Sequence, residues 1–162
     1  TVMLGGLTVD QDIAQHHDAN RMLISRDVLV RLKQSLRDSN FCGSDLKRMD
    51  LSGCVCPGSS FRGADLRDCN MSGSVLIGAD FTGADMCSAN FSMAQLLHAS
   101  FVQADMKNTN LSGIDLLSIK DALLRAASLQ GMICTMTTVP DELKERGVID
   151  SEGKDRFEST KN

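Results

Sequence analysis

The fold is decided by residues 76–106, which read LIGAD FTGAD MCSAN FSMAQ LLHAS FVQAD M when they are divided every five residues. A period of five matches neither the 3.6-residue turn of an α-helix nor the two-residue period of a strand. It indicates a chain that turns a corner every five residues and closes a four-sided coil every twenty. The large side chain of each unit is Phe41, Leu46, Leu51, Cys56, Phe61, Leu66, Met71, Leu76, Phe81, Met86, Phe91, Leu96, Phe101, Met106, Leu111 or Leu116.

The other positions of the unit support this interpretation. Two residues before each large side chain the residue is mostly small, and alanine fills six such positions in a row from Ala79 to Ala104. Both positions can point inward, where the small one leaves room for its neighbours. Asp or Asn usually precedes the large residue and Gly often follows two positions after it, and both residue types suit tight corners. Stacked coils would pair at a spacing of roughly 4.8 Å.

This pattern resembles the pentapeptide-repeat family, whose unit is A-(D/N)-L-x-x. The resemblance covers residues 38–118, and it implies an all-β solenoid, namely a right-handed quadrilateral β-helix of about four coils. Met49 and Ile114 depart from it, because they are too large for the small position. The pattern breaks after Leu116, since the next large position falls on Asp121.

Short helical caps are expected at both ends of the solenoid. Ser25 is a suitable N-cap for a helix that places Val28, Leu29, Leu32 and Leu36 on one face. Ser118 similarly precedes a second short helix, and residues 131–138 are apolar enough for a closing strand. The expected segments are an N-terminal segment with its capping helix (1–37), the repeats (38–118), a C-terminal helix and closing strand (119–146) and a flexible charged tail (147–162).

Composition limits the partners of this 162-residue chain. Its net charge is −4 with both signs scattered, which offers no basic surface for nucleic acid. No stretch approaches the ~20 apolar residues that a membrane span needs. The chain begins at Thr1, so the earlier removal of a targeting peptide is left open.

The cysteines indicate a reducing compartment, such as the bacterial cytoplasm or the interior of an organelle like the plastid. In the five-residue register Cys54, Cys56 and Cys69 point inward, whereas Cys42 and Cys87 lie outside on different faces. No two of them share a column one coil apart, and we therefore expect free thiols rather than disulfides.

The four outer faces of the coil differ in polarity. The phenylalanine face (centres Phe41, Phe61, Phe81, Phe101) is mixed, the aspartate face carries Asp45, Asp65, Asp85 and Asp105, and the asparagine–serine face carries Asn70, Asn90, Asn110 and a serine column. The fourth, the apolar face, presents an outward strip that we call the apolar strip. Such patches usually mark an interface; the alternative is that residues 2–7 or a terminal helix cover it. The apolar strip consists of Val55, Val75, Ile77, Leu97 and Leu117.

No catalytic, cofactor or metal site is expected. His16 and His17 adjoin in a polar region, His98 sits at a corner, and Cys54 and Cys56 are spaced for neither zinc nor redox chemistry. The sequence favours a non-catalytic interaction or scaffold module, a subunit or assembly factor of a larger complex, which binds a protein partner or its own copies through the apolar strip. The resemblance implies the same and points to cyanobacteria and plastids. Two alternatives remain: a DNA-mimicking modulator of DNA gyrase, and a secreted bacterial effector.

Overall fold

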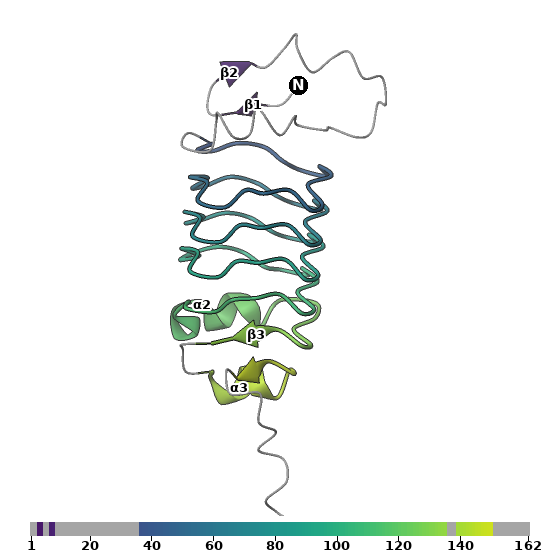
Figure 1. Ribbon diagram of the computed structural model, residues 1–162, viewed down its shortest axis with the longest axis vertical. Helices are drawn as coiled ribbons and strands as arrows, with labels where there is room; N and C mark the ends of the chain where they lie inside the picture. The colour runs from purple at the N-terminus through teal and green to yellow at the C-terminus, as the bar shows by residue number, and fades with distance from the viewer. Residues whose placement is uncertain (1–2, 5–6, 9–35, 136–138, 151–162) are drawn as a thin grey trace, which may run out of the picture.

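A computed structural model describes residues 3–4, 7–8, 36–135 and 139–150 of the chain. Its central part is a stack of similar coils (Figure 1). Parallel β-bridges join residues 20 apart on all four sides of the coil, as in Asn40↔Ser60, Asp45↔Asp65, Asp50↔Asn70 and Val55↔Val75. The 20-residue, four-sided coil that the sequence predicts is therefore confirmed.

Each corner is a tight turn that the unit's polar residues build. At Phe81 the backbone N–H of Ala84 donates to the Phe81 carbonyl at 3.0 Å, and Gly83 adopts a left-handed φ of 67°. A positive φ at the third residue is what a type II turn requires, and glycine adopts it without steric cost. The Asp80 carboxylate accepts the Thr82 N–H at 2.9 Å, which holds the corner from outside.

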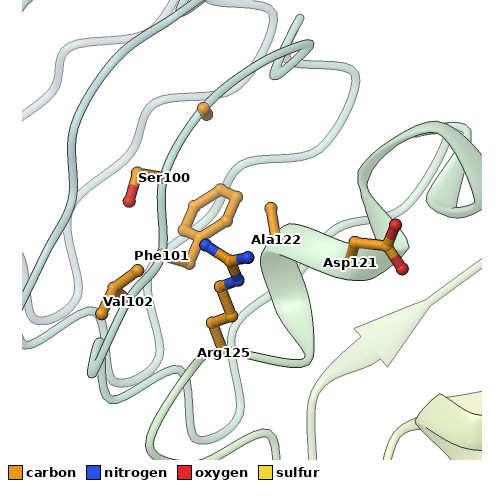
Figure 2. Close-up of a pocket in the computed structure, with 7 residues that line it drawn as sticks. Ser100, Phe101, Val102, Asp121, Ala122 and Arg125 are labelled. Carbon is orange, nitrogen blue, oxygen red and sulfur yellow. The ribbon is translucent and has the colours of Figure 1, made fainter.

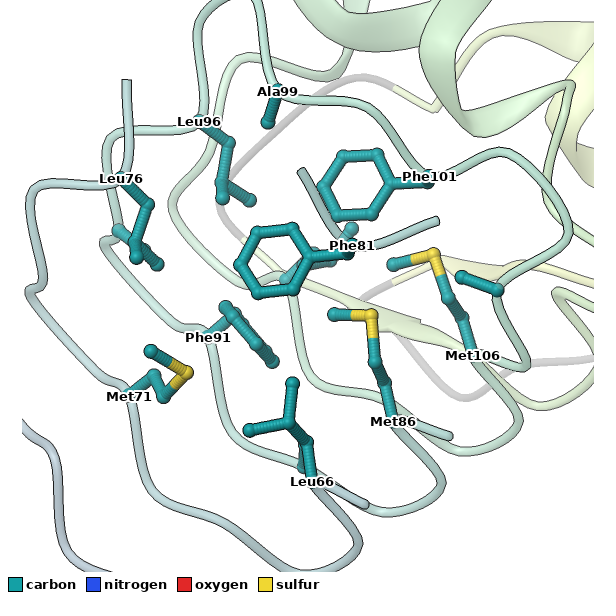
Figure 3. Packing of buried hydrophobic residues seen from close by; sticks show 14 of the residues in the cluster. Leu66, Met71, Leu76, Phe81, Met86, Phe91, Leu96, Ala99, Phe101 and Met106 are labelled. Carbon is teal, nitrogen blue, oxygen red and sulfur yellow. The ribbon is translucent and has the colours of Figure 1, made fainter. Parts of the chain in front are cut away.

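The interior contains both sets of residues that the period assigns to it. The large side chains and the small residues two before them are buried throughout residues 39–116. The phenylalanine column is one continuous stack, with ring centroids 4.8 Å apart for Phe41–Phe61, 5.0 Å for Phe61–Phe81 and 5.5 Å for Phe81–Phe101. Phe91, which lies two sides further along the chain and therefore on the opposite side of the coil, packs edge-on against Phe81 at 5.5 Å (Figure 3).

Polar residues at the small position also fit this core. Three of their hydroxyls donate to carbonyl oxygens of the preceding coil, which offsets the cost of burying them, whereas the buried Ser44 hydroxyl has no hydrogen-bond partner among the residues that the structure describes. The three bonds are Ser59 to Leu36 at 2.7 Å, Ser74 to Leu51 at 3.1 Å and Thr109 to Met86 at 2.8 Å.

The first C-terminal helix begins earlier than the sequence indicates. Helix α2 spans Leu116–Leu123, and Asp115 is its N-cap, accepting the Leu117 N–H at 3.1 Å. The expected cap, Ser118, lies inside the first turn and donates its hydroxyl to the Asp115 carbonyl. The helix starts at Leu116 because that residue keeps its inward position, and Ile119 and Leu123 are buried beside it.

Two sides of the coil continue beyond α2. Asp105 bridges to Ser128 and Asn110 to Ile133, now 23 residues apart, so pairing persists past residue 118. Strand β3 (Ile133–Cys134) then pairs in parallel with β4 (Ile149–Asp150), with helix α3 (Asp141–Lys144) between them. The Arg146 guanidinium donates to the carbonyls of Leu124 at 2.6 Å and Ala126 at 2.7 Å, and thereby satisfies acceptors left after the end of α2.

Little is described at the N-terminus. Strands β1 (Met3–Leu4) and β2 (Leu7–Thr8) form a short antiparallel pair beyond the first coil (Figure 1). The helix expected after Ser25 lies outside the described residues. The charged tail was expected to begin at residue 147, but β4 and the buried Val148 belong to the folded part, because they close the end of the stack against β3. The rest of the expected tail, from residue 151, lies outside the described residues. Within the described part of the chain, no helix has the length and apolar character needed to cross a bilayer.

Phe81 is the residue whose truncation should damage the fold most, because it contacts the rings of three other phenylalanines. We expect Phe81→Ala to lower the free energy of unfolding by about 3–5 kcal/mol, and Phe81→Leu by clearly less, since it leaves a smaller cavity. Urea denaturation followed by circular dichroism measures both. A loss below about 1 kcal/mol for the alanine variant would contradict the stacked core.

Candidate interaction surface

The structure brings four residues of the apolar strip together on neighbouring coils. Val55 and Val75 form a parallel bridge, and both side chains are half-buried. Gly78 donates to the Leu97 carbonyl at 2.9 Å, which sets Ile77 and Leu97 in register one coil apart. Their exposed fractions are 38% and 45%. Leu117, the fifth residue, lies on the first turn of α2 and is 71% exposed.

Two exposed apolar residues, Met93 and the 41% exposed Ile133 of β3, were missed by the sequence analysis. Met93 is 62% exposed and lies at the corner that leads into the apolar face. Its sulfur occupies the space that a Cβ on Gly113 would need. Met93 also has a left-handed φ of 60° in a column that is otherwise glycine at Gly53, Gly73 and Gly113. That interruption of the glycine column was the available signal.

The aspartate face is largely neutralised by its own cations. Arg67 pairs with Asp65 through two hydrogen bonds and reaches Asp85 at 3.5 Å, and Lys107 pairs with Asp105 at 3.1 Å. The hydrogen bonds from Arg67 hold the pKa of the Asp65 carboxyl below its usual value. The face therefore presents alternating charges rather than an acidic stripe.

The asparagine–serine face is a ladder of side-chain hydrogen bonds between coils. The Asn70 amide donates to Asp50 at 3.2 Å, Asn90 to Asn70 at 3.3 Å, and Asn110 to Asn90 at 3.2 Å. Each of these residues also accepts a backbone N–H two positions further on, as Asn90 does from Ser92 at 3.1 Å. Because the amides are used within the ladder, this face has a structural role.

The thiols follow the predicted register. None of the six cysteines, all in the described part of the chain, forms a disulfide; Cys54, Cys56 and Cys69 are buried, and Cys42 is exposed. The Cys56 thiol donates to the Cys54 sulfur at 3.2 Å, and this bond together with burial raises the pKa of Cys56. Burial likewise raises the pKa of Cys69 to about 12. These groups stay protonated at neutral pH, which makes them unreactive.

Cys87 differs from Cys42, although both lie outside the core. Cys87 is half-buried between Asp85 and Asp105, and its burial, reinforced by the hydrogen bond with Asp85, raises the pKa of its thiol to about 12.

Among the described residues, no three His, Cys, Asp or Glu side chains form a group that could hold a metal ion. His98 is exposed at a corner of the coil, where its backbone has a left-handed φ of 61°, and it is not part of any such group. His16 and His17 lie outside the described residues.

Comparison with known proteins agrees with the repeat geometry. The family model described as pentapeptide repeats matches eight copies, over residues 56–92 and 88–116. Residues 56–116 are thus similar to the pentapeptide-repeat family. No curated protein matches the chain.

Several solved structures of pentapeptide-repeat proteins are similar. One, from the thylakoid lumen of Arabidopsis thaliana, is 26% identical, with 65% of this chain and 74% of that chain covered and a TM-score of 0.44. Another, from Nostoc PCC 7120, is 21% identical, with coverage of 77% and 94% and a TM-score of 0.35. QnrB1, a plasmid-mediated fluoroquinolone resistance protein, is 18% identical, with coverage of 68% and 67% and a TM-score of 0.33.

Alkylation rates should separate the cysteines by location. In the native protein at pH 8, we expect Cys42 to react with iodoacetamide first, and Cys87 at least about tenfold more slowly because its raised pKa leaves little thiolate. Cys54, Cys56 and Cys69 should react only after denaturation. Peptide mass spectrometry of timed samples gives each rate. Early labelling of Cys56, or a native disulfide at any of the three inward cysteines, would contradict the register.

Proposed function

We propose that this chain is a non-catalytic protein-interaction module, a subunit or assembly factor of a larger complex, which binds a protein partner or its own copies through the apolar strip. The display framework is the right-handed quadrilateral β-helix that the family resemblance implies. Pentapeptide-repeat proteins are generally structural or interaction modules, which supports this class of function.

The observation that carries the proposal is the difference between the faces. Polar residues fit the outward positions on three sides, where they form ion pairs and amide ladders. On the fourth side the equivalent positions include Val55, Val75, Ile77 and Leu97; the two valines are half-buried, and Ile77 and Leu97 are 38% and 45% exposed. The geometry does not require apolar residues there. A flat apolar surface on a rigid framework is typical of a protein interface.

The charge pattern favours this function over a DNA-mimicking modulator of gyrase. Mimicry of duplex DNA needs a dense, unpaired negative surface, because the phosphates carry one charge per ~1.7 Å of helix axis. Here Arg67 and Lys107 interrupt the aspartate column and bond to it. A gyrase supercoiling assay distinguishes the two functions: inhibition or protection at stoichiometric amounts of this protein would favour the mimic.

Acidic substitutions in the apolar strip should abolish association. We expect the double variant Ile77→Asp/Leu97→Asp to lose partner binding and self-association by more than about tenfold, because two carboxylates would be desolvated in the interface. Light scattering after gel filtration measures self-association, and affinity purification from the native source followed by quantitative mass spectrometry measures partner binding.

The matched control is Ser72→Asp/Ser92→Asp, which adds the same charges at the equivalent positions of the adjacent face in the same coils. It should leave association unchanged. Circular dichroism should show both variants folded, since all four side chains point outward. If the Ile77→Asp/Leu97→Asp variant folds and associates as strongly as the wild type, the apolar strip is not the interface. If only that variant unfolds, the apolar strip belongs to the protein's own core.

A further inference from the structure

In the part of the chain that the structure describes, two columns of β-bridges end without a further partner, at Gln95 and at Ser100, and the second of these ends adjoins a cavity. In the regular coils Ser100 bonds twice to the coil before it: its N–H donates to the Ala79 carbonyl at 2.9 Å, and its carbonyl accepts the Phe81 N–H at 2.8 Å. One coil further on, the Ala99 carbonyl corresponds to the Ala79 carbonyl, and the Phe101 N–H corresponds to the Phe81 N–H. Among the described residues, nothing donates to the Ala99 carbonyl, and the Phe101 N–H donates to nothing.

The vacancy arises because α2 replaces this side of the next coil. The chain rejoins the stack at Arg125, whose carbonyl accepts the Gln103 N–H at 3.0 Å, one step after the missing bridge. Ala99 and Phe101 are nevertheless buried beneath the helix. Buried backbone groups without hydrogen-bond partners are rare in folded proteins. The Ala99 carbonyl and the Phe101 N–H are placed so that one extended backbone segment could bond to both.

A cavity of about 200 Å³ lies at this position. It is smaller than the ~300–1,000 Å³ typical of small-molecule sites, and suits the end of a chain better than a folded segment. Ala99 and Phe101 form its buried wall, whereas Ser100 and Val102 are partly open to solvent. The lining residues are Ala99, Ser100, Phe101 and Val102 from the solenoid and Asp121, Ala122 and Arg125 from α2 and the turn after it (Figure 2).

The cavity also has a cation at its mouth. Arg125 is exposed, and its guanidinium takes part in none of the ion pairs found among the described residues. Figure 2 shows this guanidinium extending towards Phe101, while the Asp121 carboxylate points away from it. A guanidinium in this place favours a carboxylate, which it can bind through two hydrogen bonds.

We propose that this cavity binds the C-terminal end of an extended peptide from another protein. The peptide adds the missing bridge, in the manner of strand addition at a sheet edge. Its last peptide units donate an N–H to the Ala99 carbonyl and accept the Phe101 N–H, which are the two bonds that Ser100 makes one coil earlier. Its terminal carboxylate pairs with Arg125. Small terminal side chains are favoured, because Ala99, Ala122 and the buried wall leave little depth.

The test is a titration of the full ¹⁵N-labelled chain with N-acetyl-Ala-Ala-Ala bearing a free C-terminal carboxylate, followed by NMR. We expect saturable shifts of the Phe101 amide and of the Arg125 side chain Nε–H. The same peptide with a C-terminal amide should bind about tenfold more weakly, since it loses a charge-assisted bond. The variant Arg125→Gln should show the same loss with the carboxylate peptide.

Arg37→Gln is the matched control, because it removes an exposed guanidinium at the opposite end of the solenoid. It should leave the peptide affinity unchanged. The proposal is contradicted if the carboxylate and amide peptides bind equally, if Arg125→Gln binds as tightly as the wild type while remaining folded, or if Phe101 does not shift. A parallel titration with sodium acetate is the last control. If acetate shifts the same NMR signals by the same amount and with the same affinity as the peptide, the cavity binds an adventitious anion only, and the proposal is contradicted. The site is separate from the apolar strip, so the Ile77→Asp/Leu97→Asp variant should retain it.

Discussion

The structure depends on backbone hydrogen bonding between coils. Asp65, for example, bridges to Asp45 on one side and to Asp85 on the other, so the chain must return to the same place every 20 residues. One inserted residue in a regular coil would move every later side chain out of its column. The five-residue period follows from this requirement, because four equal sides with one inward large residue each can be stacked without a void.

The same requirement makes the ends of the stack the places where the structure must change. The last coil has no further neighbour, so its backbone groups need other partners. On two sides Ser128 and Ile133 supply them; on the others α2 covers the edge, and its inward Leu116, Ile119 and Leu123 extend the core. The exchange of a strand for a helix is incomplete at Ser100, and the cavity beside Arg125 is the result.

Most of the repeat could be predicted from sequence because it is local. The buried phenylalanine stack, the inward Cys54, Cys56 and Cys69, and the corner role of the aspartates all follow from position within a five-residue unit. The start of α2 was placed too late because Ser118 and Asp115 are both good N-caps. The choice between them rests on Leu116, which has to point into the core, and that contact is not local. Met93 escaped notice for a related reason: its exposure depends on how its side chain lies over Gly113, one coil away.

The sequence by itself determined the period, the inward residues and the polarity of each face, because each of these is repeated in every unit and needs only neighbouring residues to specify it. It also determined that one face is apolar. Only the tertiary structure decided where coil pairing continues, at a separation of 23 residues instead of 20, and where it stops. The vacant bridge at Ala99 and Phe101 and the position of Arg125 depend on that change of register. They arise from the packing of a helix against a sheet edge, a long-range contact that no single five-residue unit encodes.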